Sequence, residues 1–159
     1  MTGPSTIRPA RFTDIPRLAA LMGEMHARSV YADRATLDVK AFKALCVQAA
    51  QRHGRTACLF VAEGEAAEGF VMGTVDRLFG ISRELYATDL FFYCSERSHP
   101  RDAGALLDAF LGWAGEAPGV IEIRMGVSGA IGDWRRAGAL YRRKGMAADG
   151  AMYVRRISP

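Results

Sequence analysis

The sequence is poor in the residues that build metal centres and disulfide frameworks. It contains three cysteines and three histidines in 159 residues. Cys46, Cys58 and Cys94 are far apart, form no Cys-X-X-Cys pair and have no histidine at metal-ligand spacing. This pattern argues against a zinc site and against a disulfide scaffold. We therefore expect no bound metal.

Long apolar runs are also missing. No run approaches the length of about 20 residues that a membrane-spanning helix needs. The first residues have no basic region followed by an apolar core, which is the pattern of a secretory signal. The sequence therefore predicts a cytoplasmic protein that makes no membrane contact.

The chain has only a small excess of positive over negative charge. The chain has 21 basic against 17 acidic residues, a formal net charge of +4. Many of the basic residues fall in 135–144 and at 155–156. These clusters could meet nucleic acid, but no recognised nucleic-acid-binding motif accompanies them. A phosphorylated small ligand explains them as well, and a solvated helix face is the alternative for any single arginine. Nucleic acid is therefore a disfavoured partner.

What is present is the composition and periodicity of a globular α/β protein. The length fits a single domain over residues 1–159. Strand patterns cover 6–10, 58–62, 70–75, 86–94, 120–127 and 152–154, with one more short strand near 146. Helical patterns begin with a cap at Thr13 and continue to 30, then cover 37–53, 103–114 and 133–144. We expect a mostly antiparallel twisted sheet of six to seven strands flanked by about four helices, with a ligand beside its βαβ unit.

One turn in this order has the character of an anion site. The apolar run 90–94 ends in the polar segment 95–102, and a helical period begins at Ala103. Unpaired backbone N–H groups and the positive end of a helix dipole converge at such a turn, which favours a pyrophosphate group. An ordinary capped helix start is the alternative.

At this point the chain resembles the GNAT superfamily of N-acetyltransferases over nearly its whole length, in particular the short enzymes encoded in phage and prophage regions. The segment Leu140-Tyr141 with Gly145-Met146 is similar to the family's Leu-Tyr-X-X-X-Gly-Phe. The other residues that carry the resemblance are Ile7-Arg8-Pro9-Ala10, Thr13-Asp14-Ile15, Ala87-Thr88-Asp89-Leu90, Tyr93 and residues 121–127.

The resemblance implies acetyl-CoA as co-substrate. The family signature, Gln or Arg, two residues, Gly, one residue, then Gly or Ala, would begin at Ser98, so Ser98 and Arg101 depart from it. Pro100 also removes one backbone N–H from the cradle. The implied cofactor-binding residues are Phe92, Tyr93, Cys94, Ser98, Arg101, Asp102, Ala103, Gly104 and Ala137.

The resemblance also implies the catalytic groups. Tyr141 matches the family's general acid, and a phenol suits that role because it stays protonated near neutral pH. Its ring could instead only pack against the sheet. Asp89 is the candidate base, because desolvation in an apolar strand raises a carboxyl pKa. It could equally be a paired structural acid.

On the acceptor side, the resemblance implies His26 and Tyr31 at the end of the first helix and in the following loop. Glu122 is a further candidate there and the second candidate for the base. His26 could be an ordinary surface residue, and Glu122 could form a salt bridge with Arg124. Cys94 could be a nucleophile or a buried structural thiol.

The implied function is transfer of an acetyl group to a primary amine of a small molecule or peptide. A non-catalytic acyl-CoA-binding or regulatory module with the same fold is the alternative. A homodimer is compatible with the sequence.

Overall fold

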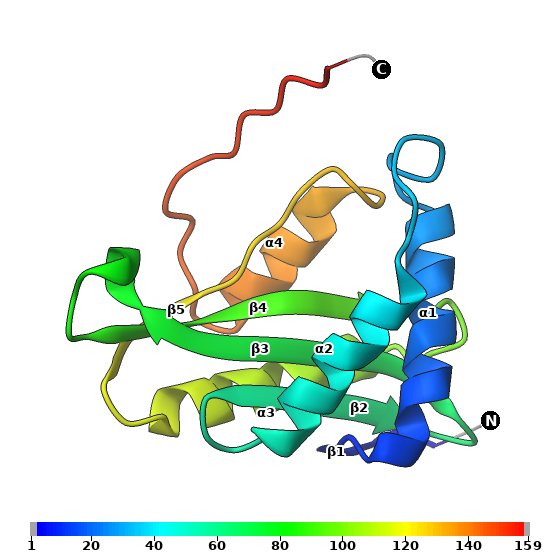
Figure 1. Cartoon of the computed structure of the whole chain (residues 1–159), viewed down its shortest axis with the longest axis horizontal. Helices are drawn as coiled ribbons and strands as arrows, with labels where there is room; N and C mark the ends of the chain where they lie inside the picture. The colour runs from blue at the N-terminus through cyan, green and yellow to red at the C-terminus, as the bar shows by residue number, and fades with distance from the viewer. Residues whose placement is uncertain (1–2, 158–159) are drawn as a thin grey trace.

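The computed structural model describes residues 3–157 and is built on an open five-stranded sheet (Figure 1). The strands β1 to β4 pair antiparallel, and β5 lies parallel to β4. They lie side by side in chain order, as β1 (Thr6–Pro9), β2 (Ala57–Glu63), β3 (Ala67–Arg77), β4 (Leu85–Cys94) and β5 (Val120–Arg124).

Four α-helices accompany the sheet, as predicted: α1 (Ile15–Ala27), α2 (Val39–Gln51), α3 (Asp102–Glu116) and α4 (Trp134–Arg143). Asp38 caps α2 by accepting a hydrogen bond from the Ala41 N–H at 2.9 Å. The predicted cap at Thr13 is wrong, because a 3-10 turn (Phe12–Asp14) leads into α1. A second 3-10 turn (Leu78–Gly80) lies between β3 and β4.

The helices cover the two faces of the sheet separately. The residues of α1 and α2 pack with one face, and those of α3 and α4 pack with the other. Side chains alternate along β2 accordingly: Leu59 and Val61 belong to the first core, and Cys58 and Ala62 to the second. The predictions that Cys46 and Cys58 lie in the core are confirmed, since both are fully buried.

Two irregularities in β4 shape the region of the predicted site. The pairing with β3 shifts so that Met72 faces Phe91 and Gly73 faces Asp89, which leaves Leu90 as the extra residue of a bulge. Pairing with β5 ends where Thr88 faces Arg124. Asp89 therefore stands where β4 and β5 part.

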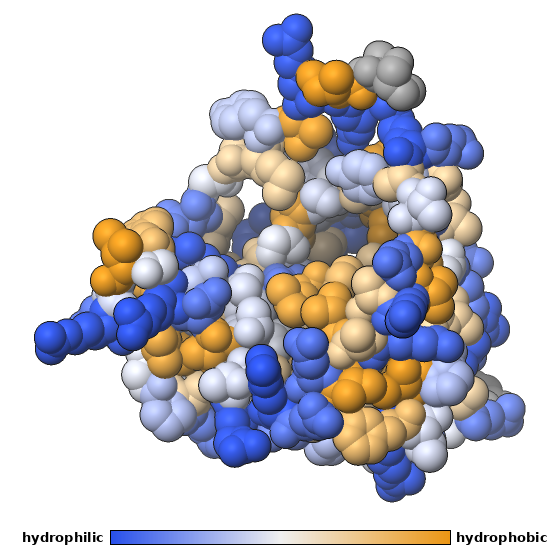
Figure 2. Space-filling model, in the orientation of Figure 1, coloured by the Kyte–Doolittle hydropathy of each residue, from blue (hydrophilic) through white to orange (hydrophobic). Residues whose placement is uncertain are grey.

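The sheet has fewer strands than predicted. Residues 146–157 form no helix or strand, so the strands expected near 146 and at 152–154 are absent. The segment leaves the body of the molecule, and its end projects outward in the space-filling view (Figures 1 and 2). Met152 and Tyr153 are 68% and 94% exposed. β-propensity acts through neighbouring strands, and no strand of the described residues pairs with this short apolar run.

β5 is also shorter than predicted, since it ends at Arg124 and not at residue 127. The Gly126 N–H donates to the Asp89 carboxylate, so it is not available to continue a backbone ladder with β4. In the described part of the chain no helix is long and apolar enough to cross a membrane.

Candidate functional site

A cleft of about 720 Å³ lies between the end of β4, the start of α3 and one face of α4. Seven of the nine predicted cofactor-binding residues line it together: Phe92, Tyr93, Cys94, Arg101, Ala103, Gly104 and Ala137. The remaining wall comes from Pro100, Ala105, Asp108, Arg136, Leu140, Arg143 and Lys144. The topology thus joins the polar turn before α3 to a helix that follows it by about thirty residues.

The backbone at the start of α3 offers hydrogen-bond donors to this cleft. The N–H groups of Ala103 and Gly104 make no backbone hydrogen bond within residues 3–157, as expected for the first turn of a helix. α3 runs for 15 residues, so its positive end adds to the attraction for an anion. Pro100 contributes no N–H, so the donors that remain lie at Ala103 and Gly104.

Three arginine side chains give the cleft a positive charge. Arg101, Arg136 and Arg143 line it, and none of them forms a side-chain hydrogen bond or ion pair within the described residues. Lys144 is different, because its Nζ lies 2.7 Å from Asp108 Oδ2. Arg136 and Arg143 were not among the predicted cofactor-binding residues, although a phosphorylated ligand was one interpretation of the basic cluster to which they belong. Their spacing of seven residues, two turns of one helix face shared with Leu140, is a signal that could have found them.

Ser98 and Asp102, the other two predicted cofactor-binding residues, do not line the cleft. The Ser98 hydroxyl donates to the Ser95 carbonyl oxygen at 2.7 Å. Asp102 is 1% exposed, and its Oδ2 accepts hydrogen bonds from the Ser5 hydroxyl at 2.8 Å and the His99 N–H at 3.0 Å. Both side chains hold the turn in shape, which is a role that the family signature did not indicate.

Asp89 and Tyr141 are both hydrogen-bonded to the backbone of Gly126. The Gly126 N–H donates to Asp89 Oδ1 at 3.1 Å, and the Tyr141 hydroxyl makes a long hydrogen bond of 3.5 Å to the Gly126 carbonyl oxygen. Tyr141 is 8% exposed, and its ring stacks on Phe92 at a centroid distance of 6.5 Å. Phe92 also lines the cleft, so Tyr141 packs against a wall of the cleft, although neither Tyr141 nor Asp89 lines the cleft itself.

Burial shifts the proton affinity of both groups in the same direction. It raises the pKa of Asp89, although the hydrogen bond from Gly126 partly opposes the shift. Burial also raises the pKa of Tyr141, and the negative charge of Asp89 raises it further. A carboxylate with increased proton affinity thus lies near a phenol that keeps its proton at neutral pH. Such a pair can accept one proton and donate another.

Two predicted acceptor residues lie around the α1–α2 loop. The His26 ring nitrogen Nε2 lies 2.8 Å from the Ala35 carbonyl oxygen, so His26 closes this loop. The Val30 N–H donates to the Ala130 carbonyl oxygen at 2.9 Å, which ties the loop to the segment after β5. Ala130 follows Gly126 by four residues, a span of at most about 14 Å. Tyr31 is 41% exposed beside this connection.

Glu122 forms a salt bridge with Arg124, which was one of its two interpretations. The Arg124 guanidinium also lies 4.6 Å from the centre of the Tyr86 ring. Cys94 has a thiol pKa raised to about 12 by burial and by the charge of Asp102. A thiol in that environment stays protonated, which favours the structural interpretation over a nucleophile.

No family model and no curated protein matches the sequence. Solved structures do match it. A ribosomal-protein-alanine N-acetyltransferase from Brucella melitensis biovar Abortus 2308 is 20% identical, with 98% of this chain and 100% of that chain covered and a TM-score of 0.69. A glucosamine-6-phosphate N-acetyltransferase from Arabidopsis thaliana is 11% identical over 96% and 98%, with a TM-score of 0.70.

An aminoglycoside acetyltransferase from an uncultured soil metagenomic sample is 17% identical over 97% of this chain and 95% of that chain, with a TM-score of 0.68. These likenesses extend over whole chains, although the identities are low. The predicted likeness to phage-encoded enzymes stays a prediction. The five-stranded sheet with its four flanking helices therefore has the fold of these structures, which is the GNAT fold that the resemblance implies.

Proposed function

We propose that this protein is an acetyl-CoA-dependent N-acetyltransferase that acts on a primary amine. The observation that carries the proposal is that Asp89 and Tyr141 are both hydrogen-bonded to Gly126, while the Tyr141 ring stacks on Phe92 in the wall of a cleft with unpaired donors. An anion site alone would fit any phosphorylated ligand. A proton acceptor and a proton donor beside that site fit a transfer reaction.

Acetyl-CoA would place its phosphates against the start of α3. The Ala103 and Gly104 N–H groups, the helix dipole and Arg101 are the donors at that end. Arg136 and Arg143 face them from α4 and suit the remaining phosphate charge. The pantetheine arm would then run past Phe92 and Cys94 toward Tyr141, with the Cys94 amide near the thioester carbonyl.

The chemistry is direct transfer. The amine nitrogen attacks the thioester carbonyl carbon, forming the C–N bond, and the C–S bond breaks. Asp89 takes the proton that the amine loses, and Tyr141 gives its proton to the departing thiolate. The raised pKa of Asp89 favours its step, because the carboxylate binds a proton more readily. The raised pKa of Tyr141 keeps the phenol protonated before the transfer, although it also makes the phenol a weaker acid toward the thiolate.

The acceptor is a primary amine of a small molecule or a peptide. The acceptor would approach the thioester past the α1–α2 loop. His26 holds this loop through its contact with Ala35, and the exposed Tyr31 would contact the acceptor. The solved structures named above are acetyltransferases of chemically different acceptors, namely a ribosomal-protein alanine, glucosamine-6-phosphate and an aminoglycoside, so the class of amine is found by a direct screen.

The test is release of free CoA thiol from acetyl-CoA in the presence of an amine panel. The panel contains a peptide with N-terminal alanine, an amino sugar phosphate, an aminoglycoside and a polyamine. Amine-dependent thiol release by the wild-type protein supports the proposal. Binding of acetyl-CoA with no release for any amine would favour the non-catalytic acyl-CoA-binding module.

A further inference from the structure

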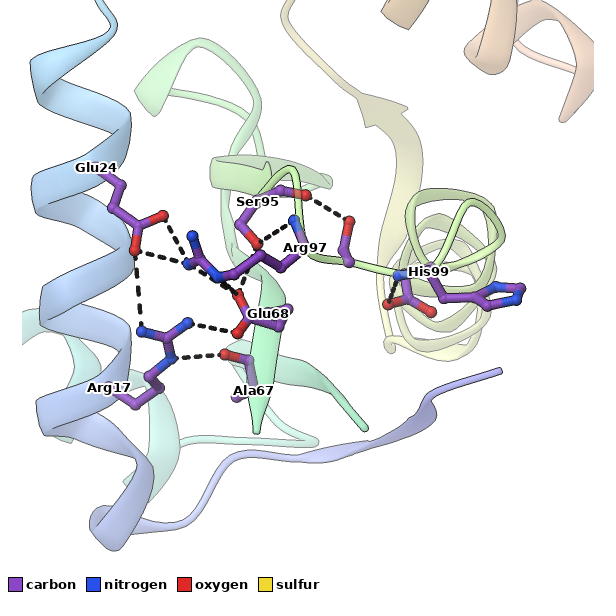
Figure 3. Close-up of polar contacts among 9 residues, drawn as sticks. Arg17, Glu24, Ala67, Glu68, Ser95, Arg97 and His99 are labelled. Atoms are coloured by element: carbon purple, nitrogen blue, oxygen red, sulfur yellow. Dashed lines mark hydrogen bonds and ion pairs between the residues drawn. The ribbon is translucent and has the colours of Figure 1, made fainter. Parts of the chain in front are cut away.

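A network of four charged side chains lies beside the turn that precedes α3 (Figure 3). Arg17 and Glu24 come from α1, Glu68 from the start of β3, and Arg97 from the turn itself. Arg97 Nη2 contacts both carboxylate oxygens of Glu24, at 2.8 and 2.9 Å. Its Nε donates to Glu68 Oε2 at 3.1 Å, and Arg17 Nη2 lies 2.7 Å from Glu68 Oε1. Two cations and two anions cancel, so the network adds no net charge to the cleft.

Glu68 also holds the first residue of the turn. Its backbone carbonyl accepts from the Ser95 N–H at 2.8 Å, and its Oε2 accepts from the Ser95 hydroxyl at 2.6 Å. Ser95 is only 4% exposed, so this second bond joins a buried hydroxyl to a carboxylate. A charge-assisted hydrogen bond of this kind is stronger than one between neutral groups.

From Ser95 the constraint passes along the turn. The Ser95 carbonyl oxygen accepts from both the N–H and the hydroxyl of Ser98, at 3.1 and 2.7 Å. The Ser95 hydroxyl oxygen accepts from the Arg97 N–H at 3.1 Å. Asp102 fixes the other end, as described above. The turn is therefore tied at both ends, and the amides of Ala103 and Gly104 follow directly.

The same contacts separate the roles of the two arginines in the turn. Arg97 is committed to the carboxylates of Glu24 and Glu68. Arg101 has no side-chain partner within residues 3–157 and lines the cleft. Glu68 thus keeps Arg97 away from the ligand while it orients the backbone that leads to Arg101.

We propose that Glu68 is the positioning residue of the phosphate-binding turn: through Ser95 and Arg97 its carboxylate fixes the backbone that presents the Ala103 and Gly104 amides and Arg101 to acetyl-CoA. The inference rests on the proposed function, because acetyl-CoA is the ligand concerned. Glu68 itself does not line the cleft and touches no reacting atom.

A merely stabilising salt bridge would behave differently, and the chain offers a matched control. Glu63 ends the neighbouring strand β2 and binds Arg8 with both carboxylate oxygens, at 2.8 and 2.9 Å. It makes no contact with residues 95–104. Glu63→Gln therefore removes one carboxylate charge from an arginine pair and breaks no side-chain hydrogen bond to the turn.

The experiment compares wild type, Glu68→Gln and Glu63→Gln. Acetyl-CoA affinity is measured by titration calorimetry, kcat and KM by thiol release, and hydrogen exchange of the 96–104 amides by mass spectrometry in the absence of ligand. For Glu68→Gln we expect Kd and KM for acetyl-CoA to rise about tenfold, with kcat at saturation within about twofold of wild type. Exchange in 96–104 should increase in this variant alone.

Glu63→Gln should keep the wild-type Kd for acetyl-CoA, even if its thermal unfolding midpoint falls as far as that of Glu68→Gln. Wild-type affinity in Glu68→Gln, or unchanged exchange in 96–104, would overturn the inference and leave the proposed function intact. An equal loss of affinity in both variants would also overturn it. Failure of the wild-type protein to bind acetyl-CoA would instead overturn the proposed function, and the inference with it.

Discussion

Asp89 and Tyr141 are both hydrogen-bonded to the backbone of one residue, since Gly126 donates its N–H to Asp89 and its carbonyl oxygen accepts from the Tyr141 hydroxyl. One side chain comes from β4 and the other from α4. A single glycine therefore sets the separation between the candidate base and the candidate acid. Their arrangement depends on the segment after β5 as much as on their own elements.

Replacing Tyr141 by Phe removes the proposed acid and keeps the ring that stacks on Phe92. We expect kcat to fall by about 100-fold or more, because general acid catalysis contributes on that scale. Stability should change by less than about 1 kcal/mol, since the hydroxyl makes only one long hydrogen bond. Thiol release and urea unfolding measure the two effects. Tyr153→Phe, at a 94% exposed position, is the control; equal kcat in both variants would remove Tyr141 from the mechanism.

Replacing Asp89 by Asn should separate activity from stability. The folded-state pKa of Asp89 is raised, so its contribution to stability is present below the ordinary carboxyl pKa and is lost as the pH rises through the raised value. The wild-type unfolding free energy should fall across that window, and the variant should lack this fall. At neutral pH we therefore expect a variant of at least comparable stability with a much lower kcat. Urea unfolding measures the stability, and pH–rate profiles measure the activity. If the rate of the variant rises with pH on the acidic side in the same way as that of the wild type, Asp89 is not the base.

Replacing Arg101 by Ala should weaken acetyl-CoA binding about five- to tenfold, because a guanidinium contact with a phosphate is lost. The dependence of Kd on salt concentration should become shallower, since one charge leaves the interaction. Calorimetry at two salt concentrations measures both. Arg55→Ala makes the same change of net charge at an exposed site outside the cleft. The same loss of affinity in Arg55→Ala would mean that only overall charge matters.

We expect a Gly→Ala substitution to have opposite effects on the free energy of unfolding at two positions. A Cβ at Gly73 would lie 2.5 Å from Cε2 of Phe110, so Gly73→Ala overpacks the core behind the β4 bulge. We expect a loss of about 1–3 kcal/mol in unfolding free energy. A Cβ at Gly112 in α3 meets nothing within 4 Å, and Gly112→Ala should add about 0.5–1 kcal/mol. Urea unfolding at one temperature compares the two variants with the wild-type protein. A Gly73→Ala variant as stable as wild type would contradict the close packing of Gly73 against Phe110.

Most of the fold could be predicted from hydrophobic periodicity. The side chains of 58–62 point alternately into the two cores, so this apolar run was recognisable as a strand. The helix at 103–114 was recognisable by its single apolar stripe. The prediction of a strand at 152–154 was wrong, because this short apolar run has the right propensity but no neighbouring strand in the described residues. Local sequence records propensity, whereas strand formation requires a partner.

The site could be predicted only in part for a related reason. Ala103 and Gly104 follow a recognisable strand–turn–helix order, and the family resemblance assigned them to the cofactor site on that order. Glu68 acts through contacts with Ser95 and Arg97, which lie more than twenty residues away along the chain, and no local pattern indicates such a contact. The role of Gly126 lies in its backbone atoms, which its sequence position does not reveal.

Titration calorimetry of acetyl-CoA into the wild-type protein tests the central claim most directly. We predict saturable binding with a Kd between about 1 μM and 1 mM, competition by CoA but not by NAD, and a matching rise of the thermal unfolding midpoint. No heat of binding and no rise of the midpoint at millimolar acetyl-CoA would contradict the account, because the cleft between β4, α3 and α4 would then have no acyl donor to bind.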